Sequence, residues 1–135
     1  MNERKRNLKK KTLLPIAALA AVLCVYVLGS GFMRNGSVFI SDFSVSPDGT
    51  EMTVTVGVAA SAGFVRKAAI RQQEDGKLYL DFYYAFGGVN GSLGAKQQFT
   101  VPLEEDTALV AIHRNSDCYE EVLTKDADGV WRRVR

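Results

Sequence analysis

The chain has 135 residues, with 17 Lys or Arg, 15 Asp or Glu and one histidine, giving a formal net charge of +2 at pH 7. From residue 35 onward, however, ten basic residues stand against fourteen acidic ones, a net charge of −4. A mildly acidic domain lacks the positive surface that binds a phosphate backbone, so we expect no nucleic-acid partner. About one hundred residues are enough for one hydrophobic core and too few for two.

The chain begins with a basic tail, residues 1–11, followed by a stretch without charges, residues 12–33. The twenty-two residues of that stretch would span roughly 33 Å as a helix, enough to cross a hydrocarbon core of about 30 Å. Pro15 fits the first turn of such a helix, where its missing N–H has no partner to lose. We therefore predict a single-pass transmembrane signal-anchor helix over 12–33.

The charges around this helix predict its orientation. Six basic residues precede the apolar stretch, and only Arg34 follows it closely. The positive-inside rule then keeps the tail in the cytoplasm and places the remaining chain outside it, tethered to the cell membrane. One alternative is a cleaved signal peptide and a secreted domain, with residues 27–29 and 29–31 as two poor cleavage sites. Another is lipidation at Cys24, which lacks the small preceding residue that bacterial lipoprotein signals require.

Residues 34–37 are predicted to be a short tether to one β domain, residues 38–135. Period-two alternation bounded by turn residues indicates the strands. The expected strands are 38–45, 51–58, 64–73, 77–86, 96–103, 108–114, 119–125 and 130–135. Only 64–73 is ambiguous, because its alanines and long side chains would also tolerate a helix. The pattern predicts an immunoglobulin-like antiparallel β-sandwich of seven to eight strands, with a small β-barrel as the runner-up.

The strongest strand, 77–86, carries the candidate ligand site. Its inward face is predicted to hold Leu78, Leu80, Phe82, Tyr84 and Phe86. Tyr79, Asp81 and Tyr83 share the other face, where two exposed tyrosines would make a stacking surface for a sugar or peptide. The plain alternative is that these tyrosines cover the flank of a neighbouring strand. The glycine-rich loop that follows adds four residues to the candidate site: Gly87, Gly88, Asn90 and Gly91.

No group of residues has the types and spacing of a known chemistry. Cys118 is expected to be buried or half-buried, and nothing orients it toward His113 as a nucleophile pair. A single histidine makes zinc improbable, and the glycine-rich loop leads into a strand rather than the helix that phosphate sites use. Residues 126–129 (Asp-Ala-Asp-Gly) are better explained by a hairpin turn than by calcium. We expect no enzyme, no metal and no cofactor.

Three segments, 43–58 (FSVSPDGTEMTVTVGV), 63–66 (GFVR) and 82–96 (FYYAFGGVNGSLGAK), together resemble a group of small membrane-anchored proteins from Gram-positive, clostridial-type bacteria. The resemblance implies the topology and the β domain, and it implies no activity. The expected function is a non-catalytic, membrane-tethered extracytoplasmic module that binds a protein, peptide or cell-wall glycan. The alternatives are an accessory or regulatory subunit of a larger membrane complex, and a secreted β-sandwich that binds glycan or peptide.

Overall fold

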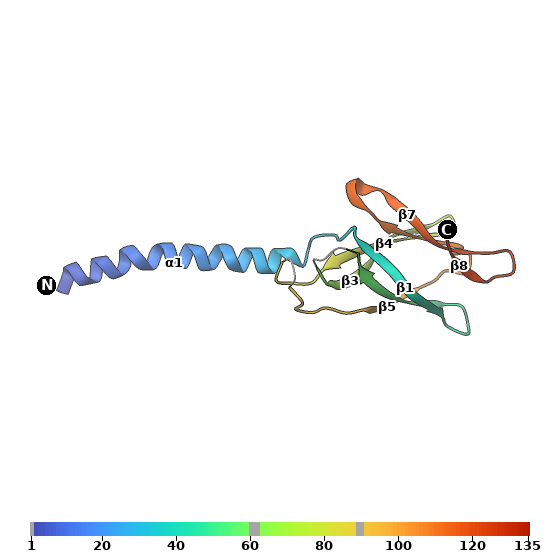
Figure 1. The fold of residues 1–135 in the computed structure, drawn as a ribbon, viewed down its shortest axis with the longest axis horizontal. Helices are drawn as coiled ribbons and strands as arrows, with labels where there is room; N and C mark the ends of the chain where they lie inside the picture. The colour runs from blue at the N-terminus through green and yellow to red at the C-terminus, as the bar shows by residue number, and fades with distance from the viewer. Residues whose placement is uncertain (1, 60–62, 89–90) are drawn as a thin grey trace.

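The computed structural model describes residues 2–59, 63–88 and 91–135, in which one long helix precedes a domain of eight strands (Figure 1). The helix is α1 (Asn2–Ser30). The strands are β1 (Val38–Val45), β2 (Glu51–Val58), β3 (Val65–Glu74), β4 (Lys77–Tyr84), β5 (Gln98–Pro102), β6 (Leu109–His113), β7 (Tyr119–Lys125) and β8 (Trp131–Arg133). The ambiguous segment 64–73 is therefore a strand, as predicted.

Helix α1 projects from one end of the β domain (Figure 1). Its stretch Lys9–Ser30 is long and apolar enough to cross a membrane, and its residues are exposed except for the half-buried Val27 and the buried Ser30. The helix begins earlier than predicted, because the basic tail is also helical, so Pro15 lies inside the helix and not in its first turn. It also ends earlier, at Ser30, where two glycines flank the last helical residue.

The strands form two sheets, one with the order β1–β2–β5 and one with the order β3–β4–β6–β7–β8. The predicted β-sandwich is confirmed, and neither sheet closes into the alternative barrel. One strand pair departs from the expected antiparallel arrangement: β4 and β6 are parallel, with Lys77 opposite Leu109. Parallel neighbours need a crossover connection, and here the chain passes through β5 in the other sheet before it returns as β6.

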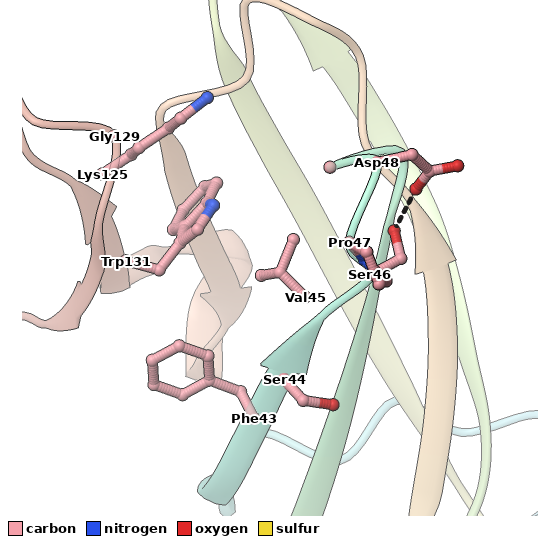
Figure 2. Close-up of a pocket in the computed structure, with 10 residues that line it drawn as sticks. Phe43, Ser44, Val45, Ser46, Pro47, Asp48, Lys125, Gly129 and Trp131 are labelled. Atoms are coloured by element: carbon pink, nitrogen blue, oxygen red, sulfur yellow. Dashed lines mark hydrogen bonds between the residues drawn. The ribbon is translucent and has the colours of Figure 1, made fainter.

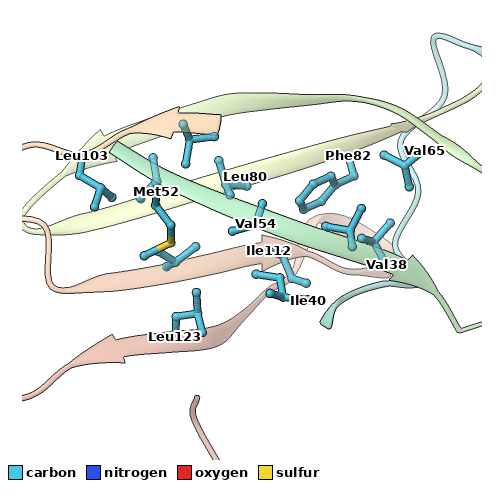
Figure 3. Packing of buried hydrophobic residues seen from close by; sticks show 14 residues of the cluster. Val38, Ile40, Met52, Val54, Val65, Leu80, Phe82, Leu103, Ile112 and Leu123 are labelled. Carbon is cyan, nitrogen blue, oxygen red and sulfur yellow. The ribbon is translucent and has the colours of Figure 1, made fainter. Parts of the chain in front are cut away.

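One hydrophobic core lies between the two sheets (Figure 3). Its buried members are Val38, Ile40, Met52, Val54, Val56, Val65, Leu78, Leu80, Phe82, Val101, Leu103, Val110, Ile112 and Leu123. The predicted inward face of β4 is correct from Leu78 to Phe82. Tyr84 and Phe86 are only half-buried, because β4 ends at Tyr84 and the chain turns away from the core. Trp131 is partly buried and packs against the core.

Residues 33–35 run alongside the end of β4 instead of hanging free between helix and domain. The Asn35 N–H donates to the Phe82 carbonyl at 2.7 Å, and the Tyr84 N–H donates to the Met33 carbonyl at 3.0 Å. Between them, Arg34 forms an antiparallel bridge with Tyr83. The start of the segment 34–37, which the sequence suggests as a tether, is thus fixed to the sheet. Hydrogen bonds to β4, in addition to the covalent chain, therefore hold the residues after the helix against the domain.

Candidate functional site

The structure places Tyr79, Asp81 and Tyr83 on the outer face of the five-stranded sheet but does not leave them open as a platform. Asp81 is only 2% exposed. Its carboxylate accepts a hydrogen bond from the Tyr119 hydroxyl at 2.6 Å, and its other oxygen lies 3.7 Å from Arg34. Tyr79 meets Tyr119 edge to face, with 5.1 Å between ring centroids. Tyr79 and Tyr83 are both half-buried. Tyr79 packs against Tyr119, which agrees with the alternative prediction that these tyrosines cover the flank of a neighbouring strand.

The ionic contacts continue from Arg34 toward the turn before β7. Arg34 also donates to Asp117, whose carboxylate lies 4.0 Å from Nε2 of the buried His113. Cys118 is exposed, contrary to the prediction, because it follows a turn in which Ser116 and Asp117 have positive φ and precedes the first residue of β7. Its sulfur contacts the Ser116 carbonyl at 3.8 Å, while His113 faces Asp117.

The half-buried Tyr119 hydroxyl should make the stability of the fold depend on pH in the alkaline range. Burial, and then the hydrogen bond to Asp81, raises the pKa of Tyr119 from 10.0 to about 12. The folded chain therefore holds this proton more tightly than the unfolded chain, so its stabilising contribution is complete below pH 10.0 and is lost as the pH rises toward about 12. We expect the free energy of unfolding to fall between about pH 10 and about pH 12 more steeply in the wild type than in Tyr119→Phe, as measured by urea denaturation. Equal slopes would contradict the assignment.

The predicted glycine loop lies against the end of helix α1 and not beside the tyrosines as a ligand cradle. The N–H groups of Gly87 and Gly88 both donate to the Ser30 hydroxyl, at 3.0 and 2.9 Å. A side chain at Gly91 would meet the backbone of Gly87, so the loop needs glycine for close packing with itself. Asn90, the remaining predicted loop residue, lies outside the described residues.

A cleft of about 540 Å³ opens at the end of the domain farthest from the helix. Its walls are the turn between β1 and β2 and the hairpin between β7 and β8, which belong to different sheets. Figure 2 shows the Trp131 and Phe43 side chains facing the same space, with Val45 beside them. Ser46, Asp48 and Lys125 supply polar groups at its rim. The cleft thus combines two aromatic rings with hydrogen-bonding and charged groups, a combination found in small-ligand sites.

Local hydrogen bonds hold the first wall of this cleft in shape. The Asp48 carboxylate accepts from the Ser46 hydroxyl at 2.6 Å and from the Thr50 hydroxyl at 2.8 Å (Figure 2 shows the first). These bonds, that from Ser46 first, lower the pKa of Asp48 and keep it ionised. Gly49 has a φ of 74°, which permits the tight turn. A wall fixed in this way needs little ordering when a ligand binds.

The hairpin that forms the second wall is fixed in the same manner. Asp126 accepts hydrogen bonds from the Val130 N–H at 2.9 Å and the Asp128 N–H at 3.1 Å. Its other carboxylate oxygen accepts from Arg132 at 2.8 Å. The hairpin turn predicted in place of a calcium loop thus has its aspartate occupied by hydrogen bonds within the turn. This geometry holds Trp131 at the cleft.

Sequence reasoning missed the cleft because its walls are nearly ninety residues apart along the chain (Phe43 and Trp131). The Ser-Pro-Asp-Gly turn at residues 46–49 and the tryptophan at position 131 are each visible in the sequence. Nothing local says that these two features face one another. One local signal was available: Trp131 lies in a short terminal strand, which offers too few neighbours to bury a large ring completely. Such a ring is expected to remain partly open to a ligand.

No family model, no curated protein and no solved structure matches this chain. Within residues 2–59, 63–88 and 91–135, no three or more His, Cys, Asp or Glu side chains are grouped so that they could hold a metal ion.

Proposed function

We propose that this protein is a non-catalytic binding module, anchored by α1 in the cell membrane, whose β-sandwich lies outside the cytoplasm and binds a cell-wall glycan in the cleft between the two hairpins. The cleft carries the proposal, since the Trp131 and Phe43 rings can stack on sugar faces. Lys125 also lines the cleft, and its ammonium group could donate hydrogen bonds to ring substituents. The resemblance to proteins of Gram-positive bacteria supports a thick wall as the source of the glycan.

The basic residues before α1 and the position of the cleft support the proposed membrane topology. The basic residues before α1 favour a cytoplasmic N-terminus. The cleft lies at the opposite end of the molecule from α1 (Figure 1), which would point it away from the membrane and toward the wall. An anchored module with its binding site at the far end suits a ligand that surrounds the cell.

Trp131 is the only tryptophan, so tryptophan emission comes from the cleft alone. We expect soluble peptidoglycan fragments, added to the full chain in detergent, to shift the Trp131 emission with a saturable dependence on concentration. Phe43→Ala should weaken this binding about tenfold or more, because one stacking ring is lost. Phe39→Ala is the matched control: it removes the same side chain from the same strand, but away from the cleft.

Three outcomes would count against the glycan. Equal affinity in wild type and Phe43→Ala would show that the cleft is not the site. A response to peptides without sugar would make the ligand a peptide. A stoichiometric membrane partner that is lost when α1 is exchanged for an unrelated anchor would favour the accessory subunit, for which α1 offers a helix that is exposed from Lys9 to Tyr26.

A further inference from the structure

The β domain touches the last turn of helix α1 directly. The Gly87 N–H donates to the Val27 carbonyl at 3.2 Å and, with the Gly88 N–H, to the Ser30 hydroxyl. A side chain at Gly88 would collide with the Tyr26 ring. All three helix residues belong to Lys9–Ser30, the stretch long and apolar enough to span a membrane. The loop after β4 therefore lies at the level of the last turn of the span.

A second contact fixes the domain's angle to the helix. The Arg66 guanidinium lies over the Phe86 ring, 4.6 Å from its centroid, and 5.6 Å from the centroid of Phe32. The two rings meet edge to face at 5.9 Å, and Arg66 also donates to the Gly31 carbonyl. Arg66 thus joins β3 to the residues just after the helix. With the hydrogen bonds of the loop, this clamp prevents the domain from tilting away from the helix end.

Large apolar side chains remain exposed around this junction. Phe32 and Met33 follow the helix and are both exposed, and Leu93, paired with Phe86 through backbone hydrogen bonds, is 68% exposed. Phe64, which precedes β3, is also exposed. Several exposed large apolar side chains at one end of a domain mark a contact with a membrane or a protein. Here the surface is continuous with the candidate membrane span, which selects the membrane.

The charges at this end differ from those of the domain as a whole. Four segments meet at the junction: residues 31–34, 63–67, 84–88 and 91–96. They contain four basic residues and no Asp or Glu, although the chain from residue 35 has a net charge of −4. Arg34 pairs with acidic residues and Arg66 serves the clamp, but Lys67 and Lys96 are exposed and form no ion pair within the described part of the chain. Such cations favour anionic lipid headgroups.

We propose that the helix-bearing end of the domain rests on the outer leaflet of the bilayer, with Phe32, Met33, Phe64 and Leu93 inserted at the interface and Lys67 and Lys96 against lipid phosphates. This inference rests on the membrane anchor of the proposed function. Combined apolar burial and cation–phosphate attraction is the usual basis of interfacial binding. Because the clamp joins the domain to the helix end, the contact also orients the distant cleft relative to the membrane.

The test uses the full chain in vesicles of phosphatidylglycerol and phosphatidylcholine whose acyl chains are brominated close to the headgroup. In a Trp131→Phe background, Leu93→Trp places the only tryptophan at the proposed contact, and its emission is excited selectively over that of the tyrosines. The matched control is Val130→Trp, at a site that is 49% exposed on the hairpin farthest from the helix. We expect quenching of the Leu93→Trp signal at least about twofold stronger than that of the control. Adding Lys67→Gln and Lys96→Gln should reduce the difference.

Equal quenching at the two positions, in protein that stays with the vesicles through an alkaline wash, would overturn the interfacial contact and leave the anchor intact. Release of the protein by that wash would overturn both the contact and the proposed anchor. A difference in quenching that is unaffected by the two lysine substitutions and by neutral vesicles would overturn the role of the lipid phosphates.

Discussion

Replacing Phe82 with alanine is expected to lower the free energy of unfolding of the β domain by about 3–5 kcal/mol. Phe82 is 1% exposed and lies in the layer between the sheets (Figure 3). Its ring meets that of Phe99, on β5 of the opposite sheet, with 5.9 Å between centroids. Alanine would lose this contact and leave a cavity that two hydrogen-bonded sheets cannot collapse to fill. Urea denaturation of the full chain in detergent, followed by Trp131 fluorescence, measures the loss.

Phe39→Ala is the control for this prediction. Phe39 is 44% exposed, and its ring lies over Gly57 of the neighbouring strand instead of between the sheets. Its removal should cost about 1 kcal/mol or less. Similar losses in the two variants would contradict a sandwich in which Phe82 joins the layers.

The strands were predictable because their signals are local. In β2 the alternation of Met52, Val54 and Val56 with polar residues marks one buried face without reference to any other part of the chain. The turn at residues 46–49 and the hairpin at 126–129 bound their strands by residue type alone. Three predicted strands, 38–45, 51–58 and 119–125, match the observed bounds for this reason.

Features that depend on distant residues were not predictable. The alternation of β4 places Asp81 on the face away from the core, and that is correct, but its burial is due to Tyr119, thirty-eight residues later, and Arg34, far earlier. The parallel pairing of β4 with β6 depends on how the chain crosses between sheets, which no strand pattern encodes. The use of Gly87 and Gly88 to bind the helix end likewise requires knowing where α1 ends in space. The one local sign of the buried cluster was an aspartate in the middle of the strongest strand.

Asp81→Ala is expected to lower the free energy of unfolding by about 2–3 kcal/mol. The substitution leaves the half-buried Tyr119 hydroxyl without its acceptor and removes one of the two carboxylates that face Arg34. Removing one partner of a fully buried ion pair costs about 3–5 kcal/mol. We expect less because Arg34 keeps Asp117 and its side chain is 33% exposed. Denaturation in urea, as for Phe82, measures the change.

Three further variants separate burial from charge. Asp81→Asn keeps an acceptor for Tyr119 and should cost less than alanine, and Tyr119→Phe combined with Asp81→Ala should cost less than the sum of the two single changes. Asp42→Ala, the control, removes an exposed strand carboxylate and should change stability by about 0.5 kcal/mol or less. If Asp81→Ala were as mild as this control, the carboxylate would be solvated and the face between Tyr79 and Tyr83 open to ligands. The two tyrosines would then be the better candidate for a stacking platform than the distant cleft. A large loss in the free energy of unfolding would instead assign Asp81 to stabilising the sheet and leave the cleft as the binding surface.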